Sequence, residues 1–382
     1  MARVDAVRSV LPAPSHLSVS RRASVNSPLL TTLALIAAVL PGCDLVGGHD
    51  RLDEGQRLRV IEYGEQPGSR AEYARLATLV IPGAVVVLDP GEGGAPRVVR
   101  SIRIPDHLTS DAQLDRDGYL WVATPDRNSV PLRIAYVLDP STGTVVRAIE
   151  LPQDLRSVAA LVVGRDRVFL RSWRDGFSGA VGAVDRRCAT VSSACEPTVL
   201  TELGNVGTSS ENAFILDGDT LFSFSNPNSR DEREAVDRID TRTGKITATA
   251  PYGGKSVADD DFIYAVAFFE PGVNSIVKLD KATLGVVDQL VVGPEPALLA
   301  LQDGVLYDTG FRDDVVRVRS TETLEVEREI DVSSTRGATA AFGFLAPDVL
   351  VLSHAAYLDL GTETIGEFPV EAMFSQSLRL AE

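Results

Sequence analysis

One short motif repeats along the chain and constrains its fold more than any other feature. An Asp followed three residues later by Thr-Gly stands between apolar runs in "VLDPSTGTVV" (residues 137–146) and in "RIDTRTGKIT" (residues 238–247). An Asp side chain accepts hydrogen bonds from backbone N–H groups two or three residues on, and Gly adopts positive φ easily. Short or alternating apolar flanks favour β-strands. The motif therefore predicts a hairpin turn between two strands.

The same turn occurs seven times, at intervals of 39–55 residues. A second marker keeps step with it, an Asp-containing turn before a β-prone run, such as Asp117-Gly118 before "YLWVA". Two markers with one period indicate a repeated unit. The first residue of each turn is predicted to be structural, and these residues are Asp89, Asp139, Asp185, Asp240, Asp280, Ser320 and Asp359.

Each unit contains four β-type runs, as in "ALLALQ", "VLYDT", "VVRVR" and "EVEREIDV" within residues 297–332. A group of four antiparallel strands in every ~40–50 residues is typical of a β-propeller, in which each group forms one blade of the WD40-like ring. We predict an all-β propeller over residues 57–382, with seven four-stranded blades. Six or eight blades, a β-sandwich and a β-solenoid remain open as alternatives. The final "QSLRLAE" predicts an extra strand that completes the first blade and closes the ring.

The N-terminal region has the features of an export signal. The run "LLTTLALIAAVL" (residues 29–40) has 12 residues, short of the roughly 20 that a membrane-crossing helix needs. With Arg21 and Arg22 before it, the run fits the apolar core of a secretory signal peptide. The sequence therefore predicts an exported protein.

The residues that follow, Leu40-Pro41-Gly42-Cys43, resemble the lipobox of bacterial lipoproteins. The resemblance implies that residues 1–42 are a signal peptide, that Cys43 is lipidated, and that residues 43–56 form a tether. Several acyl chains on one residue hold a protein firmly on a membrane. The protein is then anchored to a bacterial membrane, facing the periplasm or the cell surface, and the choice between inner and outer membrane stays open. An ordinary signal peptide with a chance Cys is the alternative.

Charge and cysteine content agree with an exported protein. The formal charge is −16, and residues 43–382 carry 33 basic and 52 acidic residues, which argues against nucleic-acid binding. Besides Cys43 the chain has Cys188 and Cys195, in "RRCATVSSACEPT". A pair in an oxidising compartment predicts a disulfide. Two free thiols, or half of a metal site, are the alternatives.

Two stretches resemble known propeller families. "DRDGYLWVAT" (residues 115–124) is similar to the NHL-type strand, and "LDPSTGTVV" and "IDTRTGKIT" resemble the strand turns of YVTN and PQQ-type propellers. The resemblance spans residues 57–382 as a periodic pattern and implies the fold rather than an activity, because propellers host unrelated functions. PQQ-type blades carry a Trp soon after Thr-Gly; this chain lacks it, so no quinone cofactor is predicted.

The sequence favours a non-enzymatic binding or scaffold module for an envelope protein, a peptide or a glycan. No catalytic or metal-ligating residue is predicted, and no cofactor. The alternative is a calcium-dependent hydrolase of the lactonase type, with carboxylates around an ion in the central channel. Its acidic candidates also suit hairpin turns, and they are Asp115, Asp117, Asp217, Asp219, Asp259, Asp260 and Asp261.

Overall fold

The computed structural model divides the chain into two compact units, Met1–Gly48 and His49–Glu382. All statements below concern the second unit. The predicted lipidation site, Cys43, lies outside the residues that the structure describes. These are residues 51–81, 83–91, 95–104, 110–124, 133–155, 157–173, 178–205, 214–225, 235–270, 273–293, 297–310, 313–335, 342–352, 356–368 and 377–379.

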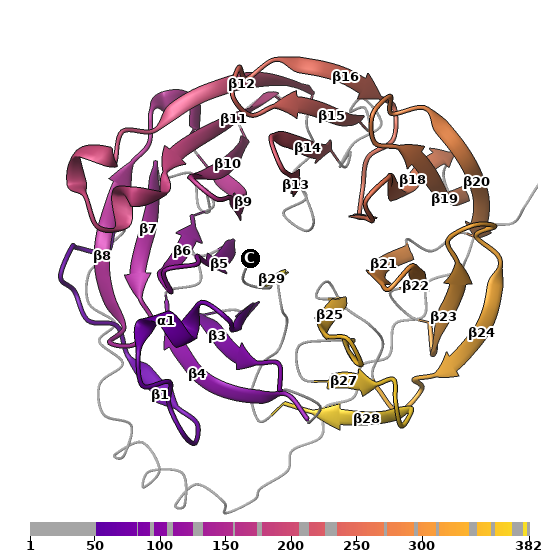
Figure 1. The fold of residues 1–382 in the computed structure, drawn as a ribbon, viewed down its shortest axis with the longest axis horizontal. Coiled ribbons are helices and arrows are strands. Elements are labelled where there is room, and N and C mark those ends of the chain that lie inside the picture. The colour runs from indigo at the N-terminus through magenta and orange to yellow at the C-terminus, as the bar shows by residue number, and fades with distance from the viewer. Residues whose placement is uncertain are drawn as a thin grey trace, which may run out of the picture. The chain divides into compact units, whose positions relative to one another are not determined.

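Seven antiparallel sheets surround a central axis, which makes this unit a seven-bladed β-propeller (Figure 1). The predicted all-β fold and the count of seven blades are confirmed. In blades 2 to 4, four strands run from the axis to the rim in chain order. They are β5 (Asp111–Leu114), β6 (Leu120–Ala123), β7 (Ile134–Asp139) and β8 (Thr144–Glu150); β9 (Val158–Val163), β10 (Arg167–Trp173), β11 (Ser178–Asp185) and β12 (Thr198–Asn205); and β13 (Phe214–Asp217), β14 (Thr220–Ser225), β15 (Ala235–Asp240) and β16 (Ile246–Ala250).

Blades 5 to 7 repeat this order. Their strands are β17 (Ser256–Ala258), β18 (Phe262–Glu270), β19 (Val273–Asp280) and β20 (Val286–Gly293); β21 (Ala297–Gln302), β22 (Val305–Gly310), β23 (Val315–Ser320) and β24 (Val326–Asp331); and β25 (Gly343–Ala346), β26 (Val349–Val351), β27 (Ala356–Asp359) and β28 (Thr364–Glu367).

Blade 1 joins the two ends of the described chain. Its second to fourth strands are β2 (Ala77–Ile81), β3 (Ala84–Asp89) and β4 (Arg97–Arg103). The C-terminal β29 (Ser377–Arg379) pairs with β2 on the axis side, and β1 (Val60–Glu62) pairs with β4 on the rim side. The predicted ring-closing C-terminal strand is therefore confirmed, and blade 1 has five strands.

The middle strands are apolar at successive positions because each blade packs against two neighbours. In β3, Val85 joins the cluster shared with blade 2, whereas Val86 joins the cluster shared with blade 7. In β14, Leu221 faces blade 3 and Phe222 faces blade 5. Each of the seven blade interfaces contains one such hydrophobic cluster. Burial on both faces is the main source of stability in this ring.

The repeated turns all lie between the third and fourth strands of a blade. Ser141 N donates to Asp139 Oδ1 at 2.9 Å, and Thr243 N donates to Asp240 Oδ1 at 2.8 Å. Backbone N–H groups two or three residues later likewise donate to the side chains of Asp89, Asp185, Asp280, Ser320 and Asp359. Each side chain satisfies a turn N–H that no strand partner could reach.

Helical segments are few and short. They are α1 (Arg70–Tyr73) and the 3-10 helices η2 (Gln153–Leu155), η3 (Arg186–Ala189) and η4 (Ser192–Ala194). None of the helices in the described ranges has the length and apolar character to span a bilayer. The connection from β11 to β12 is closed by a disulfide between Cys188, in η3, and Cys195, which directly follows η4; their Cα atoms are 4.6 Å apart. The predicted disulfide is confirmed.

An extended segment runs along the rim of blades 1 and 2. We call residues 51–63 the N-terminal strap. Gly55 N donates to Val145 O at 2.8 Å, and Val145 N donates to Gln56 O at 2.9 Å, so the strap adds to the outer edge of β8. It then continues as β1 on the outer edge of β4. Arg51, which lies in the stretch 43–56 that was predicted as a tether, bonds to Glu150 of β8.

Candidate interaction sites

The central channel contains a cavity of about 380 Å³. The innermost strands of blades 2, 4, 5, 6 and 7, or the residues beside them, supply its walls. Gln113, Ser256 and Gln302 are the polar residues among them. The other lining residues are apolar or glycine, namely Phe214, Ile215, Val257, Ala258, Leu299, Ala300, Leu301, Phe342, Gly343 and Phe344. Most of these residues are buried in the blade interfaces, and the partly exposed apolar ones are Ile215, Val257, Ala258 and Leu301.

The acidic residues weighed as metal ligands do not line this cavity. They lie in the turns between first and second strands, where most already have partners. Buried Asp115 accepts hydrogen bonds from Asp117 N, Tyr119 N and Trp121 Nε1 at 2.9–3.0 Å. Burial raises the pKa of Asp115, and the Trp121 bond opposes that rise. Its role is to hold a turn and orient an indole.

The other acidic turns have similar local partners. Asp259 accepts from Asp261 N, Phe262 N and the Tyr264 hydroxyl, at 2.7–2.9 Å. Lys281 lies 2.9 Å from Asp217, and Arg242 lies 3.5 Å from Asp219. Within the described ranges, no group of three His, Cys, Asp or Glu side chains is placed to hold a metal ion. Within the described residues, no Asp, Glu, His, Cys, Lys or Arg side chain lines the channel cavity.

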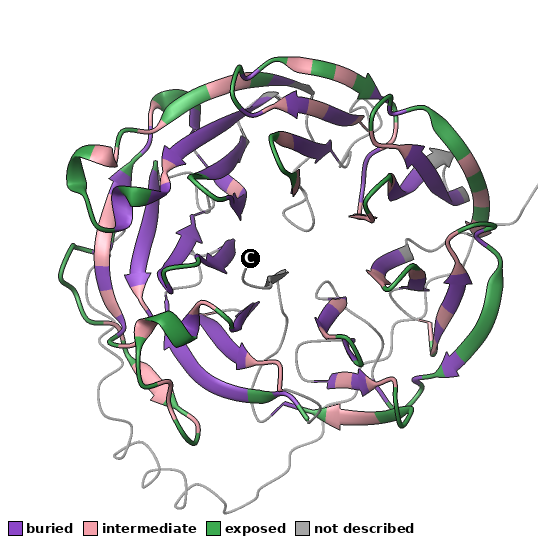
Figure 2. Ribbon diagram, viewed as in Figure 1, coloured by how far each residue is buried: buried purple, intermediate pink, exposed green. Residues whose placement is uncertain are grey.

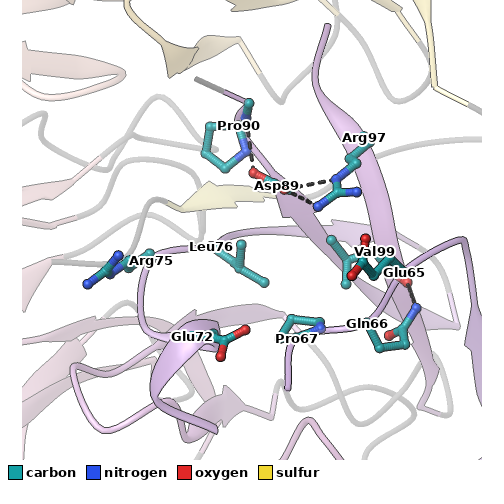
Figure 3. A pocket seen from close by; sticks show the side chains of 11 residues that line it. Glu65, Gln66, Pro67, Glu72, Arg75, Leu76, Asp89, Pro90, Arg97 and Val99 are labelled. Carbon is teal, nitrogen blue, oxygen red and sulfur yellow. Dashed lines mark hydrogen bonds and ion pairs between the residues drawn. The ribbon is translucent and has the colours of Figure 1, made fainter. Parts of the chain in front are cut away.

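A second cavity, of about 420 Å³, lies in blade 1 beside the strap (Figure 3). Its wall is charged with both signs, from Glu65, Glu72, Asp89, Arg75 and Arg97. Several of these groups are engaged locally. Asp89 forms an ion pair with Arg97 at 2.8 Å, and Glu72 accepts from Gly68 N at 2.9 Å. Charged side chains thus line this cleft, whereas none lines the described wall of the channel cavity.

The rim of the ring differs from blade to blade (Figure 2). In β4 the five central residues are buried, whereas in β24 only Ile330 is. In β20 no residue from Val286 to Val292 is buried, and Val286, Val287 and Val291 are 46%, 53% and 62% exposed. β20 pairs with β19 alone, so within the described chain its outer edge has no strand partner.

Comparison with known proteins gives the fold. No protein-family model matches the chain, and no protein of curated function has a significantly similar sequence. A chain of the mitotic checkpoint complex is 15% identical, with a TM-score of 0.53 over 89% of this chain and 99% of that one. At 13% identity, the dihydro-heme d1 dehydrogenase NirN has a TM-score of 0.53 (86% and 82% covered), and the designed Ika8 protein 0.55 (86% and 92%). At these identities the likeness shows the propeller fold alone.

Sequence reasoning missed the first half of the strap, residues 51–56, and the channel wall. Leu52 of the strap is 3% exposed, and its N–H donates to the Tyr136 hydroxyl at 3.0 Å. In the sequence, the segment "RLDEGQRL" (residues 51–58) has only two apolar residues, Leu52 and Leu58. Its pairing uses backbone groups, so it needs no apolar pattern. The channel residues look like ordinary strand residues in the sequence. Only knowledge of which strand is innermost separates Val257 or Leu301 from the core.

Proposed function

We propose that the protein is an exported, lipid-anchored propeller that binds a partner protein through its central channel, as a scaffold rather than an enzyme. The observation that carries the proposal is the channel cavity, where Ile215, Val257, Ala258 and Leu301 are partly exposed apolar residues and no charged residue lines the described wall. A cavity of about 380 Å³ suits one or two apolar side chains, which are the usual anchors of protein interfaces. A peptide or glycan partner would use the same mouth.

The fold supports this role by analogy. One structure with the same fold is part of the mitotic checkpoint complex, an assembly of proteins. A rigid ring displays loops and a channel mouth without needing to move, so binding loses little conformational entropy. The calcium-dependent hydrolase is the second candidate, because Asp259, Asp260, Asp261 and Asp303 line one cavity of about 530 Å³ formed by blades 5 and 6.

Anchoring through Cys43 gives the proposal its location. Seven residues separate Cys43 from Arg51, where the strap begins its contacts with blade 2. Fully extended, such a linker spans roughly 25–30 Å. The rim of blades 1 and 2 would then stay within that distance of the membrane surface. Substituting Cys43→Ser should release the protein from membranes; a variant that still fractionates with them would contradict the anchoring.

Site-specific photo-crosslinking in the native envelope tests the binding role. A photoreactive residue in place of Gln302, at the channel wall, should capture one discrete partner. Adding Leu301→Asp, which puts a charge into the apolar wall, should abolish the capture. The matched control is Val326→Asp on the outer strand β24, which should leave capture unchanged. Capture that is equal in both variants would show that the channel is not the binding site.

A further inference from the structure

The rim offers a second binding surface, separate from the channel. We infer that the outer edge of β20 accepts an extended, basic and apolar strand of a partner protein, which adds to blade 5 as a fifth strand. This second surface goes beyond the proposed channel role and does not depend on it. Three observations carry the inference: an open backbone edge, an occupied edge elsewhere in the same ring, and the charge of the surface.

The edge of β20 is long and apolar. Eight residues pair on one side with β19 and on the other side with no described strand. An unpaired edge presents a row of N–H and C=O groups that can template another strand. Such edges are usually blunted by charged side chains, yet Asp288 is the one charged residue of β20. Val287 and Val291 stand exposed beside those free backbone groups.

Other outer strands show how this ring protects an edge. β24 carries Glu327, Glu329 and Asp331, together with Arg328, which is paired with Glu363 of blade 7. β16, with the sequence ITATA, is five residues long, and β28 is four residues long.

β12 is as long as β20 and also has one charged residue, but of its residues only Val199, at 37%, is a large hydrophobic one that is exposed. β20 exposes three valines, at 46–62%, and so combines length and low charge with the most apolar edge among the described outer strands. That combination is the one an interacting strand requires.

The strap shows what an occupant looks like. On β4 the strap pairs Val60 with Ile102 and Glu62 with Arg100, in antiparallel register. Arg103 N also donates to Arg59 O at 2.9 Å. An extended segment thus already completes one outer edge of this ring through backbone hydrogen bonds and alternating side chains. A partner strand on β20 would repeat that geometry with a chain from another protein.

Charge and area favour another protein over a second copy. Residues 43–382 have a formal charge of −19, from 33 basic and 52 acidic residues, so two copies repel. β20 spans about 26 Å, and two rims meeting along one strand would bury less than the ~1,000 Å² that a stable dimer needs. A strand that carries Lys or Arg instead gains from Asp288 of β20 itself and from the negative charge of the protein.

A designed peptide tests the inference directly. The probe is a capped seven-residue peptide in which Val alternates with Lys and Thr, measured by fluorescence anisotropy against the purified propeller. We expect binding with a Kd of about 100 µM at low salt, weakening as salt rises. The same peptide with alternate backbone nitrogens methylated cannot donate to the edge and should not bind. These two peptides need no change to the protein.

Two variants locate the site. Val291→Lys places a like charge against the peptide and should weaken binding about tenfold. Val326→Lys makes the same change at an exposed valine of β24 and should leave the affinity unchanged. Absence of binding at millimolar peptide, or equal binding by the Lys variants, would overturn the inference. Dimers that Val291→Lys abolishes, without peptide binding, would assign the edge to a second copy and also overturn it.

These outcomes are distinct from failure of the channel proposal. If peptide binds β20 but Leu301→Asp retains partner capture, the channel role is wrong and the rim site stands. If Leu301→Asp abolishes capture and no peptide binds, the reverse holds.

Discussion

Two regions of the rim differ in whether another segment of the chain covers the outer strand. On blades 1 and 2 the N-terminal strap covers the outer strands, and the central residues of β4 are buried. On blade 5 the outer strand β20 has no described partner beyond β19, and its valines are exposed. β4 and β20 are both the fourth strand of the repeated four-stranded unit, in blades 1 and 5. The difference shows that an outer edge in this fold is an available pairing surface, filled in one place and open in another.

Truncating the buried leucine of the strap should have the largest effect on stability. Leu52→Ala removes a side chain that is 3% exposed and packs into the cluster shared by blades 1 and 2. We expect the free energy of unfolding to fall by about 3 kcal/mol, as for other buried Leu-to-Ala changes. Equilibrium denaturation in urea measures it. A loss below about 0.5 kcal/mol, typical of a surface site, would mean that the strap is only loosely attached.

The turn beneath the strap should be next in size. Gly143 has φ +68°, and an added Cβ would lie 2.4 Å from Val60 Cγ2 and 3.2 Å from Leu58 O. Gly143→Ala should therefore lower the free energy of unfolding by about 2 kcal/mol or more, from the left-handed backbone and the clash together. Gly304→Ala is the control, because Gly304 has φ +75° with nothing within 4 Å. Equal losses in the two variants would remove the strap from the explanation.

On the open edge a comparable substitution should barely matter. Val291 is 62% exposed, so Val291→Thr should change the free energy of unfolding by no more than about 0.5 kcal/mol. The same urea experiment measures it, beside Leu52→Ala. A large destabilisation would indicate that something already covers β20, and it would erase the contrast between the two edges.

The smallest effect should come from the ion pair at the start of the strap. Arg51 bonds to Glu150 of β8 at 2.8 Å, and this contact lowers the pKa of Glu150 from its usual 4.5. A lowered carboxyl pKa stabilises the folded state above the unfolded value, and the contribution disappears as pH falls through the folded value. The denaturation midpoints of wild type and Glu150→Gln should thus differ slightly near neutral pH and converge in acid. A difference that persists in acid would assign it to packing.

The sequence predicts the parts of this ring that depend on special residues. Turns need Asp and Gly at fixed positions, so Asp139 and Gly143 predict a strand reversal directly from the sequence. Two-sided burial needs successive apolar residues, as in β3. The C-terminal strand was likewise predictable, because a closed ring requires one more strand for blade 1.

The strap pairing, the open edge and the channel wall could not be predicted from the sequence, for a physical reason. The strap pairs through backbone groups, which every residue has, so Gly55 and Gln56 give no sign of their partner Val145. The outer edge of β20 is open because no described strand pairs with it, and the residues of β20 do not reveal this in the sequence. The channel wall depends on which strand is innermost, and Val257 reads like any core valine.

Backbone hydrogen exchange tests the central claim, that one outer edge is covered and another is open. The amides of Arg103 and Val145, which donate to Arg59 O and Gln56 O at 2.9 Å, should exchange about a hundredfold more slowly than the outward-facing amides of β20. Adding the Val/Lys peptide should protect the β20 amides and leave the other two unchanged. Strong protection of β20 in the free protein, or rapid exchange at Arg103 and Val145, would contradict the account.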